Sequence, residues 1–263
     1  MRELAERAYF FVCLALGRLL RSARYSKARI VYQNGELQVR KCRLFYAPLL
    51  IWMGGPLVRI LDTGVSVLAR RDWEERERLI YQSLRGTSIR IDTDRVLVLP
   101  CLGGKTLATL LEDPKLEEPV RKRAIELAVV ALAELHHLGF THGDAMAENV
   151  LVDLEAGVAH WIDFETIHDA SRPMAWRRAD DVRTLLVTSL VRTVHEDLGE
   201  ALHLILDVYA DEEVARILAT NFTSVLRRPL TFHLGQAALS FEYFREIARL
   251  LRERVGEQPV GSE

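Results

Sequence analysis

Three oxygen-bearing side chains, Asp144, Asn149 and Asp163, lie at a spacing that suits metal-assisted phosphate chemistry. Asp144 and Asn149 are five residues apart, so a single loop can turn both side chains toward one site. A carboxylate in such a loop can accept the proton of an attacking hydroxyl, and carboxylate and amide oxygens are ligands that Mg²⁺ prefers. The spacing therefore predicts a site that combines a proton acceptor with oxygen ligands for a magnesium ion.

The segment between Asn149 and Asp163 explains how the third side chain reaches the other two. Residues 150–153 and 158–162 are short apolar runs that predict two strands, and Glu155-Ala156-Gly157 between them predicts a turn. A hairpin of this length runs out and back, so it returns Asp163 to a position near Asn149. The pattern therefore specifies a geometry and not three isolated polar residues.

The stretches 141–153 and 161–165 read as H-x-D-x-x-x-x-N, a hairpin and then D-F. This pattern resembles that of the protein-kinase-like superfamily. Gly143 stands where protein kinases have Arg, and in this the chain is similar to the bacterial lipopolysaccharide (core sugar) kinase family. The resemblance covers roughly residues 28–200. It implies ATP and Mg²⁺ as cofactors. It also implies that Asp144 is the base that takes the hydroxyl proton and that Asn149 and Asp163 hold magnesium.

Two further residues near the motif receive roles from the resemblance. His142 is expected to brace the loop from a buried position rather than to transfer a proton. Asp181, at the predicted start of a helix, is expected to tie the backbone of the loop from below, and Asp180 competes for this role. The alternative for Asp181 is an acid that only favours a helix N-terminus through the helix dipole.

The resemblance also requires a lysine that reaches the nucleotide phosphates and a glutamate that holds it. Lys41 ends a predicted strand and shares a face with Val39, which makes it the candidate. The alternative is a solvated lysine on an edge strand. The run 77–84 resembles the E-x-x-x-Y-x-x-L helix of lipopolysaccharide kinase relatives, so Glu77 is the expected partner. Glu74, one turn earlier, is its competitor.

The segment that follows the predicted strand 95–99 is suited to bind adenine. By the resemblance, Leu99 is the last residue before the hinge between two lobes. Proline keeps its carbonyl although it lacks an N–H. The carbonyl of Pro100 and the N–H of Leu102 are therefore expected to meet adenine.

Three features depart from a conventional protein kinase. The N-terminal part has no G-x-G-x-x-G loop, so the turn Asn34-Gly35 is all that it offers over the phosphates. Glu165 replaces the Gly that often follows D-F, which makes this segment less free to flip. Only 18 positions separate Asp163 from Asp181, so a peptide substrate is not expected.

Arg172, Arg177 and Arg178 crowd the short segment that precedes Asp180 and Asp181. Their guanidinium groups can hold an anionic acceptor, such as a phosphorylated or acidic sugar. The alternative is that these arginines are solvated and pair with Asp169 and Asp180.

The order of the predicted elements fits a two-lobed scaffold for this site. Strands with one amphipathic helix at 72–84 come first, and after the break at 100–104 the chain is mainly helical. We therefore expect an α+β protein with a bilobal kinase-like fold, in which a small β-rich N-lobe carries one αC-type helix and the C-lobe is mainly helical. The expected boundaries are 1–25 for an N-terminal amphipathic basic helix, 26–100 for the N-lobe, 101–255 for the C-lobe and 256–263 for a flexible tail.

Composition and charge narrow the classes of function. The chain has 263 residues and a formal net charge of −2, which excludes a strongly basic nucleic-acid binder. Its three cysteines form no C-x-x-C pair, so a disulfide framework and a zinc site are not expected and a reducing compartment fits best. Neither the identity of an acceptor nor the oligomeric state follows from the sequence.

The N-terminal segment has an uneven charge, because residues 1–30 carry seven basic and two acidic side chains. The apolar run at 8–17 is followed by Arg18 and is too short for the roughly 20 residues that span a bilayer. Two interpretations remain. The segment is either a helix packed on the N-lobe or an amphipathic helix in residues 1–24 that rests on an anionic membrane surface.

The leading hypothesis is an ATP- and Mg²⁺-dependent kinase that phosphorylates a sugar hydroxyl of a lipopolysaccharide-like glycolipid or a small-molecule acceptor. It would act in the cytoplasm, or peripherally at the inner face of the cytoplasmic membrane. The first alternative is a compact atypical protein Ser/Thr kinase of the RIO-like sort. The second is a pseudokinase scaffold that binds nucleotide without turnover, for which the missing glycine-rich loop is the hint.

Overall fold

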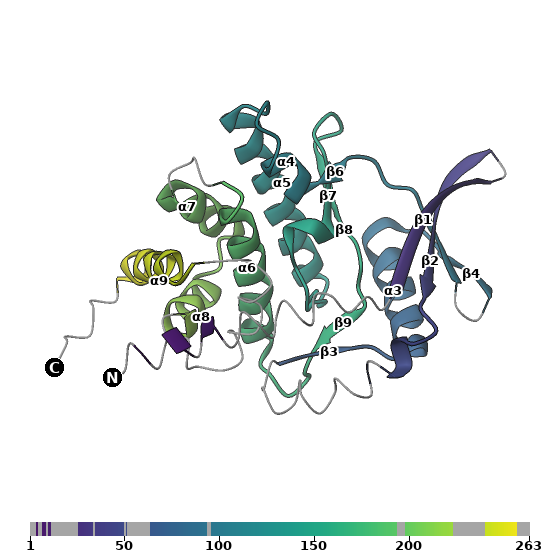
Figure 1. Ribbon diagram of the computed structural model, residues 1–263, viewed down its shortest axis with the longest axis horizontal. Helices are drawn as coiled ribbons and strands as arrows, with labels where there is room; N and C mark the ends of the chain where they lie inside the picture. Colours follow the sequence, from purple (N-terminus) through teal and green to yellow (C-terminus); the bar gives the residue numbers. More distant parts are fainter. Residues whose placement is uncertain are drawn as a thin grey trace.

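The computed structural model describes residues 4, 7, 8, 10, 11, 26–33, 35–49, 51, 64–93, 96–193, 198–222 and 240–256. Over these residues the protein is a mixed α+β protein with small antiparallel sheets and several helices, as the sequence predicts. The strands of the largest sheet lie at one end of the molecule, and the last helices of the chain lie at the other (Figure 1).

The largest sheet begins with the predicted hairpin, formed by β1 (Ser26–Gln33) and β2 (Glu36–Arg43). Gly35 in the turn has φ +84°, a conformation that glycine adopts without strain. Asn34, the other half of the predicted turn, lies outside the described residues. The turn therefore determines where β2, the strand that carries Lys41, begins.

The same sheet continues with β4 (Arg90–Thr93) and β5 (Val96–Pro100), close to the two strands predicted there. The strand order is β1-β2-β5-β4, so β2 is paired on both sides. Lys41 thus lies on an interior strand and is 5% exposed. The alternative of a solvated edge-strand lysine is wrong.

The predicted charged helix is α3 (Arg70–Arg85). Its buried face combines Trp73, Glu77 and Ile80, at the spacing that places side chains on one side of a helix. The helix ends at Gly86, which has φ +60° and donates its backbone N–H to Gln82 O. Glu77 is fully buried, and a buried carboxylate must be paired.

After β5 the chain forms the short strand β6 (Lys105–Thr106) and the helices α4 (Leu107–Leu111) and α5 (Glu118–His137). The side chain of Thr106 caps α4 by accepting from Thr109 N at 3.2 Å. Gly139 follows α5 with φ +83°, a conformation typical of the glycine that ends a helix.

The hairpin that follows the motif is also present. The 3-10 turn η1 (Ala147–Asn149) leads into β7 (Val150–Asp153), which pairs with β8 (Val158–Trp161) in antiparallel register. The short strand β9 (Thr166–His168) pairs with β3 (Val65–Val67), a segment about one hundred residues earlier in the chain.

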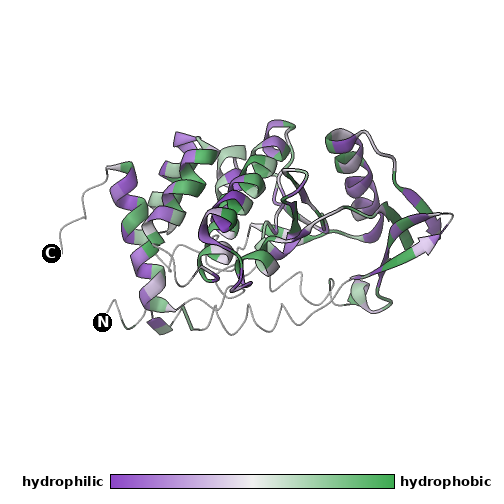
Figure 2. Ribbon diagram, turned by 90° about the horizontal axis from the view of Figure 1, so that it is seen from above, coloured by the Kyte–Doolittle hydropathy of each residue, from purple (hydrophilic) through white to green (hydrophobic). Residues whose placement is uncertain are grey.

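Four helices complete the chain: α6 (Met174–Leu190), α7 (Leu198–Tyr209), α8 (Glu212–Phe222) and α9 (Phe241–Val255). Each has apolar and polar sides, and the apolar sides supply much of the core (Figure 2). Asp181 lies within α6 and not at its start, so its predicted position at a helix start, and the helix-dipole alternative with it, is wrong. Of the predicted tail, residues 257–263 lie outside the described residues.

Two residues of the N-terminal segment, Arg7 and Phe10, contact the last helix. The ring of Phe10, which is 2% exposed, lies 5.6 Å from that of Phe241 and 6.0 Å from that of Phe244. Arg7 is 3.6 Å from the carboxylate of Glu242. For these two residues the first interpretation, a helix packed on the N-lobe, is wrong. Most of the predicted helix 1–25 lies outside the described residues. In the part of the chain that the structure describes, no helix has the length and low polarity needed to cross a membrane.

Candidate active site

Lys41, Glu77 and Asp163 meet at one point although they come from three distant segments. The Nζ atom of Lys41 lies 2.8 Å from Glu77 Oε1 and 2.6 Å from Asp163 Oδ1. Trp73 also donates to Glu77 Oε1, at 3.1 Å, and its ring lies 5.1 Å from the Lys41 ammonium. The predicted lysine and glutamate are therefore paired.

The environment of Lys41 keeps its side chain charged. Burial alone would lower the pKa of Lys41, but the carboxylates of Asp163 and Glu77 outweigh this effect and raise the pKa above its ordinary value. The result is a fixed ammonium group beside Asp163, which can contact an anionic group that approaches from solvent.

Asp144 and Asn149 lie together in the loop that precedes β7. The Nδ2 atom of Asn149 donates to the backbone carbonyl of Asp144 at 2.8 Å and to its carboxylate Oδ2 at 3.1 Å. The amide oxygen of Asn149 is then the atom that can face a cation, because its amide nitrogen is engaged. This assignment rests on the hydrogen-bond network around the amide.

The hairpin returns Asp163 to the neighbourhood of Asn149, as the sequence predicts. The backbone N–H of Ile162 donates to Asn149 O at 2.9 Å, so the two segments are joined at the residue before Asp163. Asp163 has φ +69°, an uncommon conformation for a residue other than glycine. Its side chain is about one-third exposed, which leaves the carboxylate accessible from one side.

His142 lies in the interior as a brace of the loop. Its Nε2–H donates to Ile162 O at 2.9 Å, and its Nδ1 accepts from the backbone N–H of Asp144 at 3.3 Å. Burial lowers the pKa of His142 to about 4, so the ring is neutral near pH 7. Both ring nitrogens are thus used to join Asp144 to the segment that carries Asp163.

Asp181 holds the backbone of the same loop from α6. Its carboxylate accepts from the backbone N–H of His142 at 2.6 Å and of Gly143 at 2.8 Å. The ring of His136 donates to it at 2.9 Å, and Tyr209 bonds the other nitrogen of that ring. Burial would raise the pKa of Asp181, but the neighbouring histidines lower it to about 2.

Asp180, the competitor of Asp181, has different partners. It pairs with Arg183 at 2.9 Å and bonds the ring of His168 at 3.2 Å. His168 in turn contacts Thr141 Oγ1 at 2.9 Å, next to the start of the loop. The two adjacent aspartates therefore fix two sides of one loop.

Gly143 is required by close packing as well as by conformation. It has φ +83°, and a Cβ atom at this position would lie 3.2 Å from Ile167 N and from the carbonyl carbon of Thr166. The loop thus passes directly against β9. An arginine, which protein kinases have here, would need this contact to open.

The predicted adenine segment lies at the end of β5. Leu99 is 5% exposed, and Pro100 pairs in register with Gln38 on β2, three residues from Lys41. Leu102 lies in the irregular segment that follows β5. Gly104 in this segment lies so close to β7 that an added Cβ would clash with the backbone of Val152.

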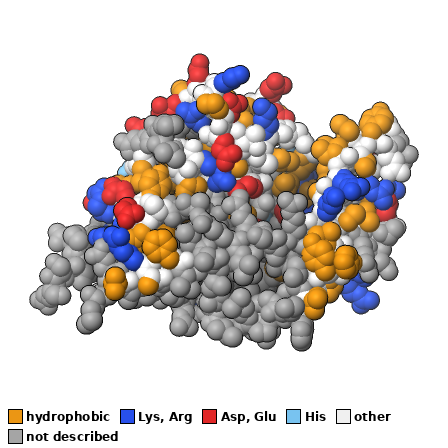
Figure 3. Space-filling view, viewed as in Figure 1, with side chains coloured by type: hydrophobic (Ala, Val, Ile, Leu, Met, Phe, Trp, Pro, Cys, Tyr) orange, Lys and Arg blue, Asp and Glu red, His pale blue; other side chains and the backbone are white. Residues whose placement is uncertain are grey.

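One face of the largest sheet is apolar next to Lys41. By register, Val39 and Leu37 on β2, Ile30 on β1 and Leu99 on β5 lie on the Lys41 side of the sheet. Ile30 and Leu37 are 66% and 55% exposed. Apolar side chains gather on the surface at this end of the molecule (Figure 3). A flat aromatic group can pack on such a surface.

The turn at Gly35 lies away from this point. Gly35 lies six positions before Lys41, which corresponds to about 20 Å along an extended strand. The end of β2 next to Gly35 extends beyond the last paired residue of β5, Pro100. The expectation that this turn covers the phosphates is therefore wrong. The residues directly before β1 lie outside the described part of the chain.

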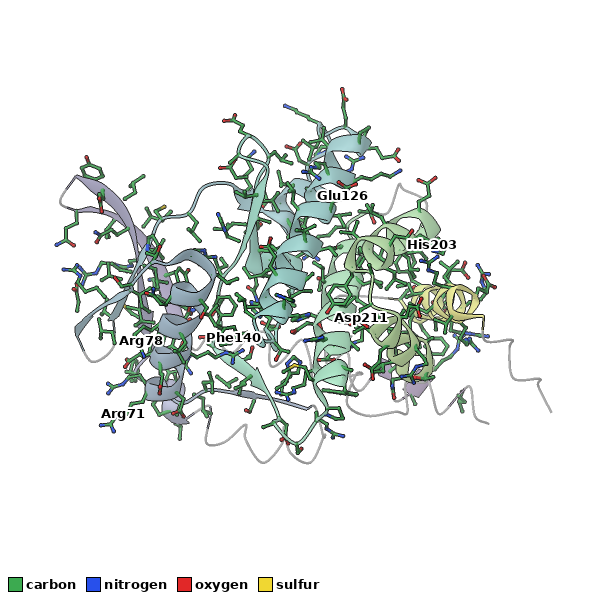
Figure 4. The ribbon with its side chains drawn as sticks, turned by 180° about the vertical axis from the view of Figure 1, so that it is seen from behind. Arg71, Arg78, Glu126, Phe140, His203 and Asp211 are labelled. Atoms are coloured by element: carbon green, nitrogen blue, oxygen red, sulfur yellow. The ribbon has the colours of Figure 1, made fainter. Side chains whose placement is uncertain are left out.

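Several residues of the site were not predicted. Arg43 pairs with Glu165 at 2.8 Å, and Arg76 on α3 donates to the carbonyl of Thr141. Arg71 and Arg78 lie instead on the exposed side of α3 (Figure 4). The period-two pattern that selected Lys41 also places Arg43 on its face, so this signal was present in the sequence.

The three arginines near α6 do not form one cluster. Arg178 donates to the carbonyl of His136 at 3.2 Å and lies 4.0 Å from Asp211, and Arg172 stacks on Trp176 at 5.4 Å. The pKa of Asp169 is lowered mainly by hydrogen bonds from Ser171 and to a smaller extent by Arg172 and Arg177.

The donor set suits magnesium better than a transition metal. The described residues contain no cluster of three or more His, Cys, Asp or Glu side chains arranged to hold a metal. Mg²⁺ commonly uses one or two carboxylates, and phosphate oxygens and water complete its shell. Asn149 and Asp163 are hard oxygen donors of this kind, so the residues present fit the ion.

Comparison with known proteins does not assign the chain. No family model matches it, and no curated protein is significantly similar to it. Two pockets in the described residues, one between α3, α5 and β8 and one beside α7, α8 and α9, include neither Lys41 nor Asp144. The candidate site is therefore argued from its own geometry.

Proposed function

We propose that this protein is an ATP- and Mg²⁺-dependent phosphotransferase with a bilobal kinase-like organisation, similar to the bacterial lipopolysaccharide core sugar kinases. The observation that carries this proposal is the convergence of Lys41, Glu77 and Asp163. Burial of a cation between two carboxylates costs desolvation free energy, and a role in binding accounts for such an arrangement. The adjoining pair Asp144 and Asn149 supplies a base and an amide oxygen.

Bound Mg-ATP supplies the phosphoryl group and the counter-charge that phosphoryl transfer requires. Asn149 and Asp163 would hold the ion, and Lys41, oriented by Glu77, would bind phosphate oxygens. The adenine ring would lie against the apolar face at Val39 and Leu99 and meet the carbonyl of Pro100 and the N–H of Leu102.

The reaction at the acceptor depends on Asp144. As the hydroxyl oxygen of the acceptor forms its bond to the terminal phosphorus, the bond from that phosphorus to the leaving oxygen of the nucleotide breaks. The carboxylate of Asp144 takes the hydroxyl proton. The short segment between Asp163 and Asp181 favours a sugar or other small acceptor over a peptide, because a peptide needs a longer docking surface.

The test is incubation of the full chain with labelled ATP and fractionated lipid, glycan and protein extracts. The glycan or glycolipid fraction is expected to take the label, and Asp144→Asn should lower transfer by about 10²-fold or more while Mg-ATP still stabilises the protein. Asp153→Asn is the matched control, because Asp153 lies at the hairpin turn and bonds the N–H groups of Glu155 and Ala156.

Other outcomes of this experiment would replace the proposal. Label in the protein fraction alone would identify a protein kinase. Thermal stabilisation by Mg-ATP without any turnover would identify a nucleotide-binding scaffold. Full activity of Asp144→Asn would show that the base lies elsewhere.

Location is a separate part of the proposal. The basic segment at residues 1–24 would bring the protein to an anionic membrane face, where a glycolipid acceptor would be reached. Deletion of this segment is expected to move the protein from the membrane fraction to the supernatant. Unchanged partitioning would exclude the membrane role.

A further inference from the structure

Two ion pairs join β2 to the segment 163–165 at matching positions. Lys41 pairs with Asp163 at 2.6 Å, and Arg43 pairs with Glu165 at 2.8 Å. Side chains two residues apart on a strand share a face, so both cations project from β2 toward the same segment. The side chain of Arg43 is 4% exposed and that of Glu165 is 16% exposed, so the second pair is largely shielded from water.

The backbone on either side of Glu165 is also anchored. The N–H of Leu68 donates to Glu165 O at 2.8 Å, and Arg43 Nη2 donates to the carbonyl of Leu68. Arg43 therefore contacts both residues that this backbone hydrogen bond joins. Its guanidinium also lies 5.1 Å from the ring of Trp73. The site is built from β2, α3 and the segment before α3.

The segment needs such an anchor because of its conformation. Asp163 has φ +69°, a left-handed conformation that is unfavourable for a residue other than glycine. Phe164 is fully buried, with its ring 4.9 Å from that of His142. Release of Glu165 would let Asp163 relax toward an extended conformation and turn its carboxylate away from Lys41.

We propose that Arg43 and Glu165 are positioning residues that keep the Asp163 carboxylate turned toward Lys41 and the magnesium-binding position. This inference rests on the proposed function, and it adds a second ion pair that the site requires in addition to that of Lys41 and Glu77. The pair acts through Asp163 and contacts neither nucleotide nor acceptor.

The test uses three variants of the full chain. Arg43→Gln and Glu165→Gln each break the pair at nearly constant size, and the double variant Arg43→Gln/Glu165→Gln removes both charges. Arg40→Gln is the matched control, because Arg40 lies on the same strand but pairs with Asp92 at 3.1 Å.

Two quantities are measured for each variant. The first is the hydrogen-exchange rate of the Leu68 amide, which reports whether its hydrogen bond to Glu165 O is kept when no nucleotide is bound. The second is the Mg²⁺ concentration at which ATP stabilises the protein half-maximally against heat. Each single variant is expected to raise the exchange rate and the half-maximal Mg²⁺ concentration by about 10-fold, because it removes a hydrogen bond between charged groups. The double variant should show no larger change than Arg43→Gln alone, because both substitutions break the same pair, and the control should match the wild type.

The outcomes separate the two proposals. Unchanged exchange and Mg²⁺ dependence in both single variants would overturn the positioning role, and so would a double variant with the summed defects of the single ones. A third outcome is that the Leu68 amide exchanges faster in the single variants but Mg-ATP does not stabilise even the wild type. This outcome would overturn the proposed function and, with it, the role of the pair in magnesium binding. In that case the ion pair would remain only a structural anchor.

Discussion

Lys41 on β2 and Glu77 on α3, 36 residues apart in the sequence, meet with Nζ 2.8 Å from Oε1. Both side chains are almost fully buried, at 6% and 0% exposure. Taking two charges out of water costs several kcal/mol for each, and only close pairing with further hydrogen bonds offsets this cost. The pair therefore joins the sheet to the helix, and neither charge is tolerated without the other.

Lys41→Met is expected to lower the free energy of unfolding by about 3–5 kcal/mol, because it leaves the Glu77 carboxylate buried without its cation. Lys41→Met/Glu77→Gln should be more stable than this single variant, since the glutamine oxygen can still accept from Trp73 without a charge. Urea denaturation measures both. A double variant no more stable than Lys41→Met would contradict the assignment, and Arg40→Met, on the same strand, is the control.

Gly143→Ala is expected to destabilise the protein by more than Gly139→Ala. Both glycines have φ +83°, so the conformational strain of an added Cβ is matched. At Gly143 the Cβ would also press on Thr166 and Ile167 at 3.2 Å, whereas at Gly139 nothing lies within 4 Å. We expect about 1 kcal/mol at Gly139 and about 1–3 kcal/mol more at Gly143. Equal losses in thermal unfolding would show that the loop does not pack on β9.

His142 is expected to make the protein less stable as the pH falls from 6.5 to 4. Its pKa is lowered from 6.5 to about 4 by burial, so the unfolded chain binds the proton first and protonation favours unfolding. The full contribution is present above pH 6.5, and about 3 kcal/mol is lost near pH 4.

The measurement for His142 is the urea midpoint at several pH values for the wild type and for His142→Gln. The difference between them should shrink as the pH falls, because only the wild type carries this titration. His137→Gln, which changes an exposed histidine nearby, should show no such trend. A difference independent of pH would mean that His142 titrates normally in the folded protein.

Local signals accounted for much of the fold. The helix ends at Gly86 and Gly139, the cap at Thr106 and the hairpin between Asn149 and Asp163 each depend on a few neighbouring residues. Such features follow from backbone conformation and hydrogen bonds within one turn, so they can be read without the rest of the chain.

Long-range contacts were predicted only where a resemblance supplied a partner. The resemblance predicts the pair of Lys41 and Glu77. It does not predict the pair of Arg43 and Glu165, which are 122 residues apart. The packing of Phe10 on α9 was likewise missed, because an apolar N-terminal segment does not specify which helix it will cover. The expected helix start at Asp181 is wrong because Pro173 is the N-cap of α6, so the helix begins earlier in the chain.

The spacing of Asp144, Asn149 and Asp163, the class of fold and the strand face that carries Lys41 follow from the order of residues along the chain. These depend on the two-residue period of a strand, the length of a hairpin and the chemistry of turns. The folded chain sets which charges are buried together and which carboxylate, Asp180 or Asp181, accepts from the backbone of the loop. Those choices depend on distance and on exclusion of water, and both arise only when segments far apart in the chain pack against each other.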